Sequence, residues 1–251
     1  MGGMTRRALL GLAAQAAAAV VLAPIARAAA PIYHGPRDER VIALTIDDDW
    51  SAARVASIFD SLQQASVTAT WFPYANAARS DPGLWRTITA AGHPYANHTR
   101  THPWMTRLTP AAQASELNHA KTILEDITRT PMLPVFRPPY GAWDSAVVGA
   151  AEAAGFPTVL MWDTSDGDTS QTPTEAKLIR NAMRGRNGSV LLTHGGPTLT
   201  PVILPTVIGL YKDLGFRFVT VPELLGLTAP NPPDAGPQAP ITTRVPGRIA
   251  F

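Results

Sequence analysis

Two histidines and a pair of adjacent carboxylates are the residues of this sequence whose types and spacing best suit chemistry. His98 and His102 are four residues apart, and Asp47 and Asp48 follow a short apolar run. A spacing of four lets two histidines face one metal ion from a single helical turn, and a carboxylate can complete the site. The sequence contains no cysteine, so any metal must bind to His, Asp or Glu. Two histidines and one carboxylate leave coordination positions open, as hydrolytic metal sites do.

Polar side chains follow five of the apolar runs along the chain. The five segments are Asp47–Trp50, His98–His102, Arg137–Gly141, Trp162–Asp168 and Thr193–His194. Because the carboxyl ends of parallel strands meet at one face of a sheet or barrel, we expect these segments to converge. Together they would supply a carboxylate that takes a proton from water, a histidine that protonates a leaving group, and an arginine that orients the carboxylate.

Each segment also has a structural interpretation when it is taken alone. Adjacent aspartates after a strand are often part of a turn or a helix cap. Alone, His194 fits a packed histidine and Arg137 a surface ion pair. His34, His93 and His119 lack a comparable setting, and we expect structural roles for them.

Alternating strands and helices must position these segments. Short, apolar, β-branched runs predict strands that are buried on both faces, which is typical of parallel sheets. We expect strands at 41–46, 69–72, 135–136, 158–162, 189–193 and 216–220. We expect helices at 52–64, 84–91, 110–127, 145–154, 173–183, 201–214 and 222–227. Six or seven such units in about 190 residues favour an α/β fold that closes as a small or incomplete (β/α) barrel.

The first 28 residues predict an export signal. Residues 1–7 are short and basic, residues 8–23 are apolar, and Ala26–Ala28 forms an A-x-A cleavage pattern. The apolar run is shorter than the roughly twenty residues that a membrane span needs, so we expect no stable membrane anchor. The pair Arg6-Arg7 is similar to a twin-arginine signal. A general secretory signal and an uncleaved anchor are the alternatives.

Charge and composition bound the rest of the chain. The signal would remove three of the 21 basic residues and none of the 19 acidic ones, so the formal net charge changes from +2 to −1. A near-neutral protein has no electrostatic basis for binding nucleic acid. We expect a lead-in at 29–39, a catalytic domain at 40–228 and a disordered, Pro-rich tail at 229–251. We also expect a monomer.

The five segments, in this order, resemble the NodB-type polysaccharide deacetylases, carbohydrate esterase family 4. Further similarity lies in Ala69–Phe72, Gly92–Thr99 and Gly215–Leu225, while Phe136–Gly141 reads F-R-P-P-Y-G. The similar region extends from Arg40 to Gly226. The resemblance implies a NodB homology domain, which is a distorted or incomplete (β/α) barrel.

The resemblance also implies roles for individual residues. Asp48, His98 and His102 would bind a divalent metal, most often zinc, with cobalt or nickel in some relatives. Asp47 would be the general base and His194 the general acid.

Other positions would support these groups. Arg137 would orient Asp47, and the backbone N–H of Tyr140 would contact the oxyanion. An aspartate would tune His194: alignment from Trp162 without a gap selects Asp168, and Asp166 is the rival. The positions expected to contact substrate are Tyr140, Leu192 (in the acetyl pocket), Trp50 and Trp162.

Three residues depart from the family pattern. Asp49 and Trp50 stand where relatives have Gly and Pro, and Thr169 stands where they have Trp. Glycine reaches backbone angles that aspartate reaches less easily, so we expect a different loop after Asp48. Asp49 adds a third carboxylate near the metal, and Trp50 could stack on a sugar ring.

These observations predict an exported metal-dependent deacetylase that hydrolyses N- or O-acetyl groups of a glycan. The candidate substrates are peptidoglycan, chitooligosaccharide, xylan and exopolysaccharide. One alternative is a hydrolase of cyclic amides or imides on the same fold. Another is a catalytically silent glycan-binding module.

Overall fold

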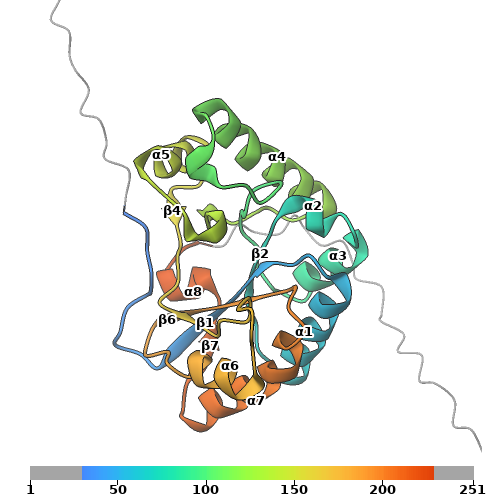
Figure 1. Ribbon diagram of the computed structural model, residues 1–251, viewed down its shortest axis with the longest axis vertical. Coiled ribbons are helices and arrows are strands. Elements are labelled where there is room, and N and C mark those ends of the chain that lie inside the picture. Colours follow the sequence, from blue (N-terminus) through green and yellow to red (C-terminus); the bar gives the residue numbers. More distant parts are fainter. Residues whose placement is uncertain (1–29, 229–251) are drawn as a thin grey trace, which may run out of the picture.

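The computed structural model describes residues 30–228 of the 251-residue chain. The predicted export signal and the predicted Pro-rich tail lie outside the described residues. Within 30–228 strands and helices alternate, as the sequence pattern predicts, and the helices surround the strands (Figure 1). None of the described helices is long and apolar enough to cross a membrane.

Parallel strands form the inner wall. They are β1 (Val41–Asp48), β2 (Thr70–Pro73), β3 (Val135–Phe136), β4 (Thr158–Val159), β5 (Thr164–Ser165), β6 (Ser189–His194) and β7 (Arg217–Val219). Strand β1 is central: β6 pairs along one edge, and β2 and β7 pair with different parts of the other edge. Strand β5 pairs with β6, while β3 and β4 form a separate parallel pair. Every residue of β1 is buried, which explains the apolar run Val41–Leu44 and Ile46, and its last two residues, Asp47 and Asp48, are buried carboxylates.

Single β-bridges join the two groups of strands into a distorted (β/α) barrel. The bridges connect Trp71 to Tyr95, Asn97 to Phe136, Ile32 to Leu160 and His34 to Ser189. The first two link β2 to β3 through segment 95–97. The last two link the end of β4 to β6 through segment 32–34, which belongs to the predicted lead-in. These lead-in residues are therefore part of the barrel wall.

Helices cover the outside of the wall. They are α1 (Ala52–Gln64), α2 (Ala75–Ala78), α3 (Pro82–Ala90), α4 (Pro110–Thr128), α5 (Ser145–Ala153), α6 (Glu175–Ala182), α7 (Thr200–Asp213) and α8 (Val221–Leu225). Two 3₁₀ turns, η1 (Met105–Arg107) and η2 (Pro139–Gly141), lie in loops. Five helices begin at a side-chain cap, made by Asp81, Thr109, Asp144, Thr174 and Thr220. Such caps satisfy backbone N–H groups in the first helical turn.

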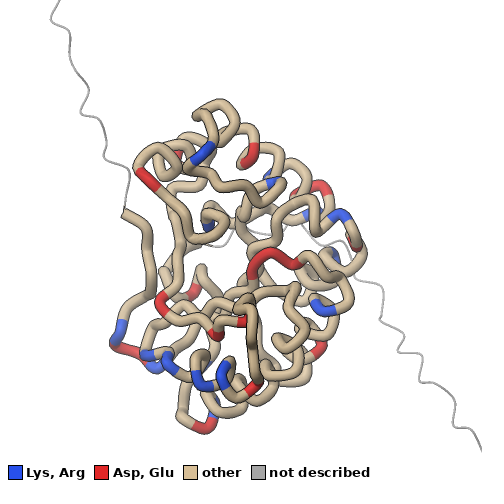
Figure 2. Tube along the Cα trace, viewed as in Figure 1, with Lys and Arg blue, Asp and Glu red and all other residues tan. Residues whose placement is uncertain are grey.

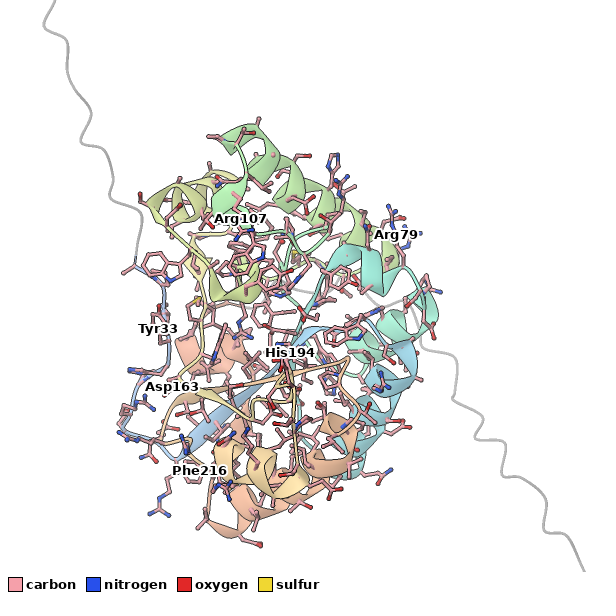
Figure 3. The ribbon with its side chains drawn as sticks, viewed as in Figure 1. Tyr33, Arg79, Arg107, Asp163, His194 and Phe216 are labelled. Atoms are coloured by element: carbon pink, nitrogen blue, oxygen red, sulfur yellow. The ribbon has the colours of Figure 1, made fainter. Side chains whose placement is uncertain are left out.

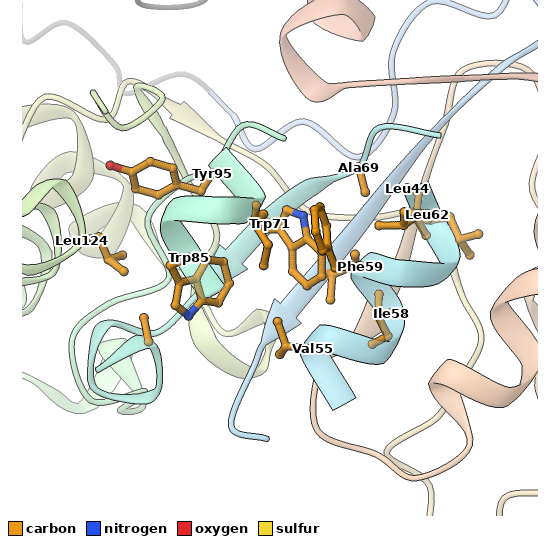
Figure 4. Close-up of a cluster of buried hydrophobic side chains, with 14 of the residues drawn as sticks. Leu44, Val55, Ile58, Phe59, Leu62, Ala69, Trp71, Trp85, Tyr95 and Leu124 are labelled. Carbon is orange, nitrogen blue, oxygen red and sulfur yellow. The ribbon is translucent and has the colours of Figure 1, made fainter. Parts of the chain in front are cut away.

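The core lies between this wall and the helices (Figure 4). Helix α1 buries Val55, Ile58, Phe59 and Leu62. Their spacing repeats with the period of a helix and so forms one apolar face. Trp71 of β2 is fully buried and meets Trp85 of α3 edge to face, with ring centroids 5.7 Å apart.

The predicted strand at 158–162 is shorter in the structure. Strand β4 ends at Val159, and the unpredicted β5 begins at Thr164. Between them, the Arg137 guanidinium donates hydrogen bonds to the carbonyls of Leu160 and Met161. The buried arginine takes two carbonyls that a longer strand would use for pairing, and the chain bends around it.

Candidate active site

The strand ends meet around a cavity of about 320 Å³. It is lined by Asp47, Asp48, His98, His102, Pro138, Tyr140, Gly141, Trp162, Ser165, Thr169, Leu192 and His194. In Figure 2 the aspartates at the end of β1 are the red stretch near the centre of the view, and Figure 3 labels His194 near the centre. The predicted site residues that do not line the cavity are Arg137 and Asp168, which are buried, and Trp50, which is exposed.

Strand register brings the first carboxylate and the last histidine together. Asp47 of β1 is paired with His194 of β6 on one side and with Phe72 of β2 on the other. The amide of Gly195 donates to the Asp47 carbonyl at 2.9 Å, which continues this pairing beyond the strand. Two residues far apart in sequence therefore lie side by side because both end parallel strands.

Asp48, His98 and His102 form a compact cluster of metal-ligand type. One ligand atom from each lies within 4.8 Å of the others. Asp48 Oδ1 is 3.1 Å from His98 Nε2 and 2.8 Å from His102 Nε2. Burial alone would raise the pKa of Asp48, but hydrogen bonds and charge from the two histidines hold it well below its usual range. The carboxylate is therefore ionised and ready to accept a cation.

The histidine protons fit a metal centre as well. His98 Nδ1 lies 2.7 Å from the carbonyl oxygen of Arg137, which can only accept, so Nδ1 carries the proton. In the neutral ring His98 Nε2, on the Asp48 side, is then the nitrogen that can bind a cation. A histidine that binds a metal through one ring nitrogen usually donates a hydrogen bond from the other, which fixes the orientation of the ring. Two imidazoles and one carboxylate suit Zn²⁺ and also other divalent transition metals.

A loop, not a helical turn, brings the two histidines together. The expected single turn of helix is wrong, since Thr99 and His102 have φ angles of 70° and 61° in a non-helical segment. The Asn97 side chain accepts from the Thr99 amide at 2.9 Å, and the Thr99 hydroxyl accepts from the His102 amide at 3.0 Å. Local side-chain bonds thus replace the helical ones.

Glu116 of α4 supports this loop and was not predicted. Its carboxylate accepts from the amides of Arg100 and Thr101 at 3.0 and 2.8 Å. It also accepts from the Thr101 hydroxyl at 3.0 Å and from the Arg100 guanidinium at 3.2 Å. One buried carboxylate therefore satisfies four donors of the residues just before His102.

Replacing Glu116 with glutamine should weaken metal binding. The amide nitrogen of glutamine cannot accept, so part of the support for His102 is lost. Outer support of metal ligands is commonly worth about 10- to 100-fold in affinity, and we expect a loss in that range in competition with a chelator. Glu125→Gln is the matched control, because Glu125 lies on the same helix and accepts from Met132 instead. Unchanged affinity in Glu116→Gln would contradict this function of the loop support.

Asp47 is held by a fully buried arginine. Arg137 Nη1 lies 2.6 Å from Asp47 Oδ1 and 2.9 Å from the Thr45 hydroxyl. The guanidinium carbon lies over the Phe72 ring, 4.1 Å from its centroid. Because its donors face fixed acceptors, Arg137 has one position, and so has the Asp47 carboxylate.

Asp168, and not Asp166, contacts the His194 ring. Asp168 Oδ1 lies 2.7 Å from His194 Nδ1, and its Oδ2 accepts from the His194 amide at 2.8 Å and the Thr200 hydroxyl at 2.7 Å. Burial would lower the pKa of His194, but the hydrogen bond and charge of Asp168 raise it to about 9. Asp166 instead accepts from the Thr193 hydroxyl at 2.7 Å. Burial and the charge of Asp168 raise the pKa of Asp166.

Replacing Asp168 with asparagine should move the alkaline limb of the pH–rate profile to lower pH. A general acid, the role predicted for His194, works while protonated, so activity is lost as pH rises through its pKa. Without the Asp168 charge the pKa of His194 falls, and the loss begins earlier. The profile of acetate release measures this, with Asp166→Asn as the comparison variant. An alkaline midpoint that moves in Asp166→Asn but not in Asp168→Asn would reverse the assignment.

The loop after Asp48 has the unusual backbone that its sequence suggests. Asp48 and Asp49 have φ angles of 68° and 62°, in the left-handed region that favours glycine. The Asp49 side chain is buried, and neither carboxylate oxygen has a hydrogen-bond partner among the described residues. Burial and the charges of Asp47 and Asp48 raise the pKa of Asp49 well above its usual value. Trp50 lies 46% exposed.

Tyr140 lines the cavity, and its ring is held by contacts with Trp104 and His102. Its φ is 60°, its ring stacks on Trp104 with centroids 4.3 Å apart, and it meets His102 edge to face. No acceptor among the described residues takes its backbone N–H. Leu192 and Trp162 form apolar parts of the lining. Sequence reasoning missed Trp104, because one tryptophan after a His-Pro pair carries no pattern.

The strand ends of this parallel barrel carry a His₂-Asp cluster, an Asp–Arg pair and an Asp–His pair. Comparison with known proteins identifies the class as carbohydrate deacetylases, which are hydrolases. The chain belongs to the polysaccharide deacetylase family, whose model matches residues 34–159.

Individual relatives agree with this membership. A peptidoglycan-N-acetylglucosamine deacetylase of Bacillus cereus is 29% identical over 76% of this chain and 90% of its own length. A peptidoglycan deacetylase of Listeria monocytogenes is 28% identical, and the match covers 74% of this chain but 39% of that longer relative. Among solved structures, a carbohydrate esterase family 4 pseudoenzyme of Bacillus anthracis superimposes with a TM-score of 0.73 at 27% identity, covering 79% and 69% of the two chains.

Proposed function

We propose that the protein is an exported, metal-dependent deacetylase that hydrolyses the N-acetyl groups of N-acetylglucosamine in peptidoglycan. The observation that carries the proposal is that one cavity holds the His₂-Asp cluster, with Asp47 and His194 both at its wall. These are the groups that amide hydrolysis requires: a means of activating water, a base and an acid.

Two residues of the chain, Asp47 and His194, carry out the two proton transfers. A divalent cation held by Asp48, His98 and His102 would polarise the acetyl carbonyl and lower the pKa of water. Asp47, oriented by Arg137, takes a proton from the attacking water. His194, kept protonated by Asp168, donates a proton to the departing sugar nitrogen.

Three further residues, Tyr140, Leu192 and Trp162, would face the acetyl end of the substrate. The Tyr140 N–H donates to the oxygen that becomes negative as water attacks. Leu192 and Trp162 give the acetyl methyl group an apolar surface. Mutagenesis of comparable single donors elsewhere places the effect of such an N–H at about 10²- to 10³-fold in turnover.

The choice of peptidoglycan rests on the relatives and on location. The curated relatives reported above are peptidoglycan deacetylases. An export signal at 1–28 would carry the protein across the membrane towards the cell wall, and such a signal is absent from the mature protein. Zinc is the first candidate metal, with cobalt and nickel next.

Acetate release by the chain from residue 29 onward tests the proposal. Peptidoglycan fragments, chitooligosaccharides and acetylated xylan are each tested after chelation and again after zinc or cobalt is restored. We expect metal-dependent acetate, with the highest kcat/KM on peptidoglycan fragments. Faster release from another glycan would change the proposed substrate and leave the proposed reaction, deacetylation, unchanged.

The same experiment decides the alternatives. A carbohydrate esterase family 4 pseudoenzyme shares this fold, so a metal-loaded protein that releases no acetate would favour a silent glycan-binding module. Hydrolysis of cyclic imides without acetate release would favour the other hydrolase branch. The intact Asp47, Asp48 and His194 positions support catalysis.

A further inference from the structure

Trp50 differs from four other exposed aromatic residues, Tyr33, Trp104, Tyr140 and Trp143, in making neither an aromatic contact nor a side-chain hydrogen bond among the described residues. Tyr140 and Trp104 stack on each other, and Trp143 donates a hydrogen bond to the Tyr33 hydroxyl. No aromatic ring or cation among the described residues packs on Trp50, although it is nearly half exposed. An exposed, unpartnered indole beside an active site is a surface for a flat, apolar ligand face.

Two glycines, Gly195 and Gly196, pack directly against the side chains of Asp49 and Trp50, and we call this pair the glycine bed. A Cβ added to Gly196 would lie 1.8 Å from the Trp50 ring, and one added to Gly195 would lie 2.0 Å from the Asp49 carboxylate. The side chains of Asp49 and Trp50 therefore occupy the space that larger residues at 195 and 196 would need. Because the bed covers one side of the indole, the exposed part faces away from the backbone.

This bed joins the Trp50 surface to the reacting groups. Gly195 directly follows His194, and Trp50 lies two residues after Asp48. Both neighbours line the cavity, whereas Trp50 does not. A ligand on Trp50 would therefore lie outside the cavity but next to the acid that protonates the leaving sugar nitrogen.

Polar groups accompany the indole. The Arg54 guanidinium donates to the Gly196 carbonyl at 2.7 Å and to the Thr198 hydroxyl at 3.2 Å. Arg54 is part-exposed and Thr198 is exposed. Trp50 and Arg54 therefore both contact Gly196. An aromatic face with polar groups nearby suits a pyranose ring, which has an apolar C–H face and a hydroxyl rim.

We propose that Trp50, on its Gly195–Gly196 bed, forms a subsite for the sugar adjoining the one that is deacetylated. The proposal rests on the proposed function and adds to it the residue that binds the second sugar of the glycan chain. The reacting sugar lies over the cavity, and the adjoining ring stacks on the indole beside Arg54 and Thr198.

Kinetics on sugars of two lengths test the subsite. Acetate release is measured with N-acetylglucosamine and with its β-1,4-linked tetramer, for the wild type and Trp50→Ala. Aromatic packing of this kind corresponds to a change of about 3- to 10-fold. We expect Trp50→Ala to raise KM for the tetramer by that factor and to leave kcat/KM for the single sugar unchanged.

Three further variants distinguish the loss of ring stacking at position 50 from a general loss of activity. Trp50→Phe keeps an aromatic face and should recover most of the tetramer preference. Gly196→Ala pushes the ring off its bed and should reproduce the Trp50→Ala result. Trp143→Ala, a similarly exposed tryptophan outside the cavity lining, should keep the preference.

The outcomes distinguish failure of the subsite from failure of the proposed function. Equal changes for both sugars, or none, in Trp50→Ala would overturn the subsite while the deacetylase remains. A wild-type protein that releases acetate from neither sugar, nor from peptidoglycan fragments, would overturn the proposed function and the subsite with it.

Discussion

Replacing His98 with alanine should empty the metal site and abolish deacetylation. His98 supplies one of three ligand atoms within 4.8 Å of one another, and Asp48 and His102 alone would leave a two-ligand site. Sites with two protein ligands bind zinc far more weakly than the three-ligand sites of hydrolases. The variant should therefore purify without stoichiometric metal and release no measurable acetate.

Elemental analysis and acetate release should be measured on the same samples. The matched control is His119→Ala: His119 is exposed and makes its side-chain hydrogen bond within α4, to Ser115. It should keep both metal and activity. Since His98 is buried, a melting curve of His98→Ala is needed to show that the protein is folded. A folded His98→Ala protein with full metal content would remove His98 from the ligand set.

Replacing Asp47 with asparagine should lower turnover by about two to four orders of magnitude, the usual contribution of a general base. Asparagine has nearly the same shape and can still accept the hydrogen bond from Arg137, but it cannot take a proton from water. Asp48, His98 and His102 are unchanged, so metal content should remain stoichiometric. Lost turnover with retained metal is the result that separates a base from a ligand.

Stability must be measured alongside, because the substitution leaves the buried Arg137 charge without its carboxylate. Breaking such a pair typically costs about 3–5 kcal/mol when a partner is deleted. Asparagine keeps one hydrogen bond, so we expect a smaller loss. Assays are run well below the melting temperature of the variant. Near-wild-type turnover in folded Asp47→Asn would show that another group accepts the proton.

Much of the site was predictable because parallel strands impose one rule. Asp47 and His194 each end an apolar run, and strand register makes them neighbours. Arg137 follows another apolar run and reaches Asp47 through its guanidinium. The first relation needs only the strand positions. The choice between Asp166 and Asp168 was less secure in the sequence, since both lie beyond β5 in a loop whose path depends on Thr193 and Thr200.

The parts that sequence reasoning missed depend on single contacts without a period. A helical turn was expected for His98 and His102, because four-residue spacing fits one. Asn97, Thr99 and Glu116 instead hold a loop through side-chain bonds that no hydrophobic pattern records. The lead-in also contains no strand signal.

The closure of the barrel by segment 32–34 has a consequence for how the chain folds. Ile32 and Leu160 are 128 positions apart, and His34 and Ser189 are 155 apart. Contacts of such high contact order form slowly, because the intervening chain must first be ordered. The stretch that is synthesised early can therefore take its place in the wall only after β4 and β6 exist. A recombinant fragment that starts at Arg40, where the similarity to the family begins, would leave a gap between those strands; the shortest stable fragment should begin before Ile32.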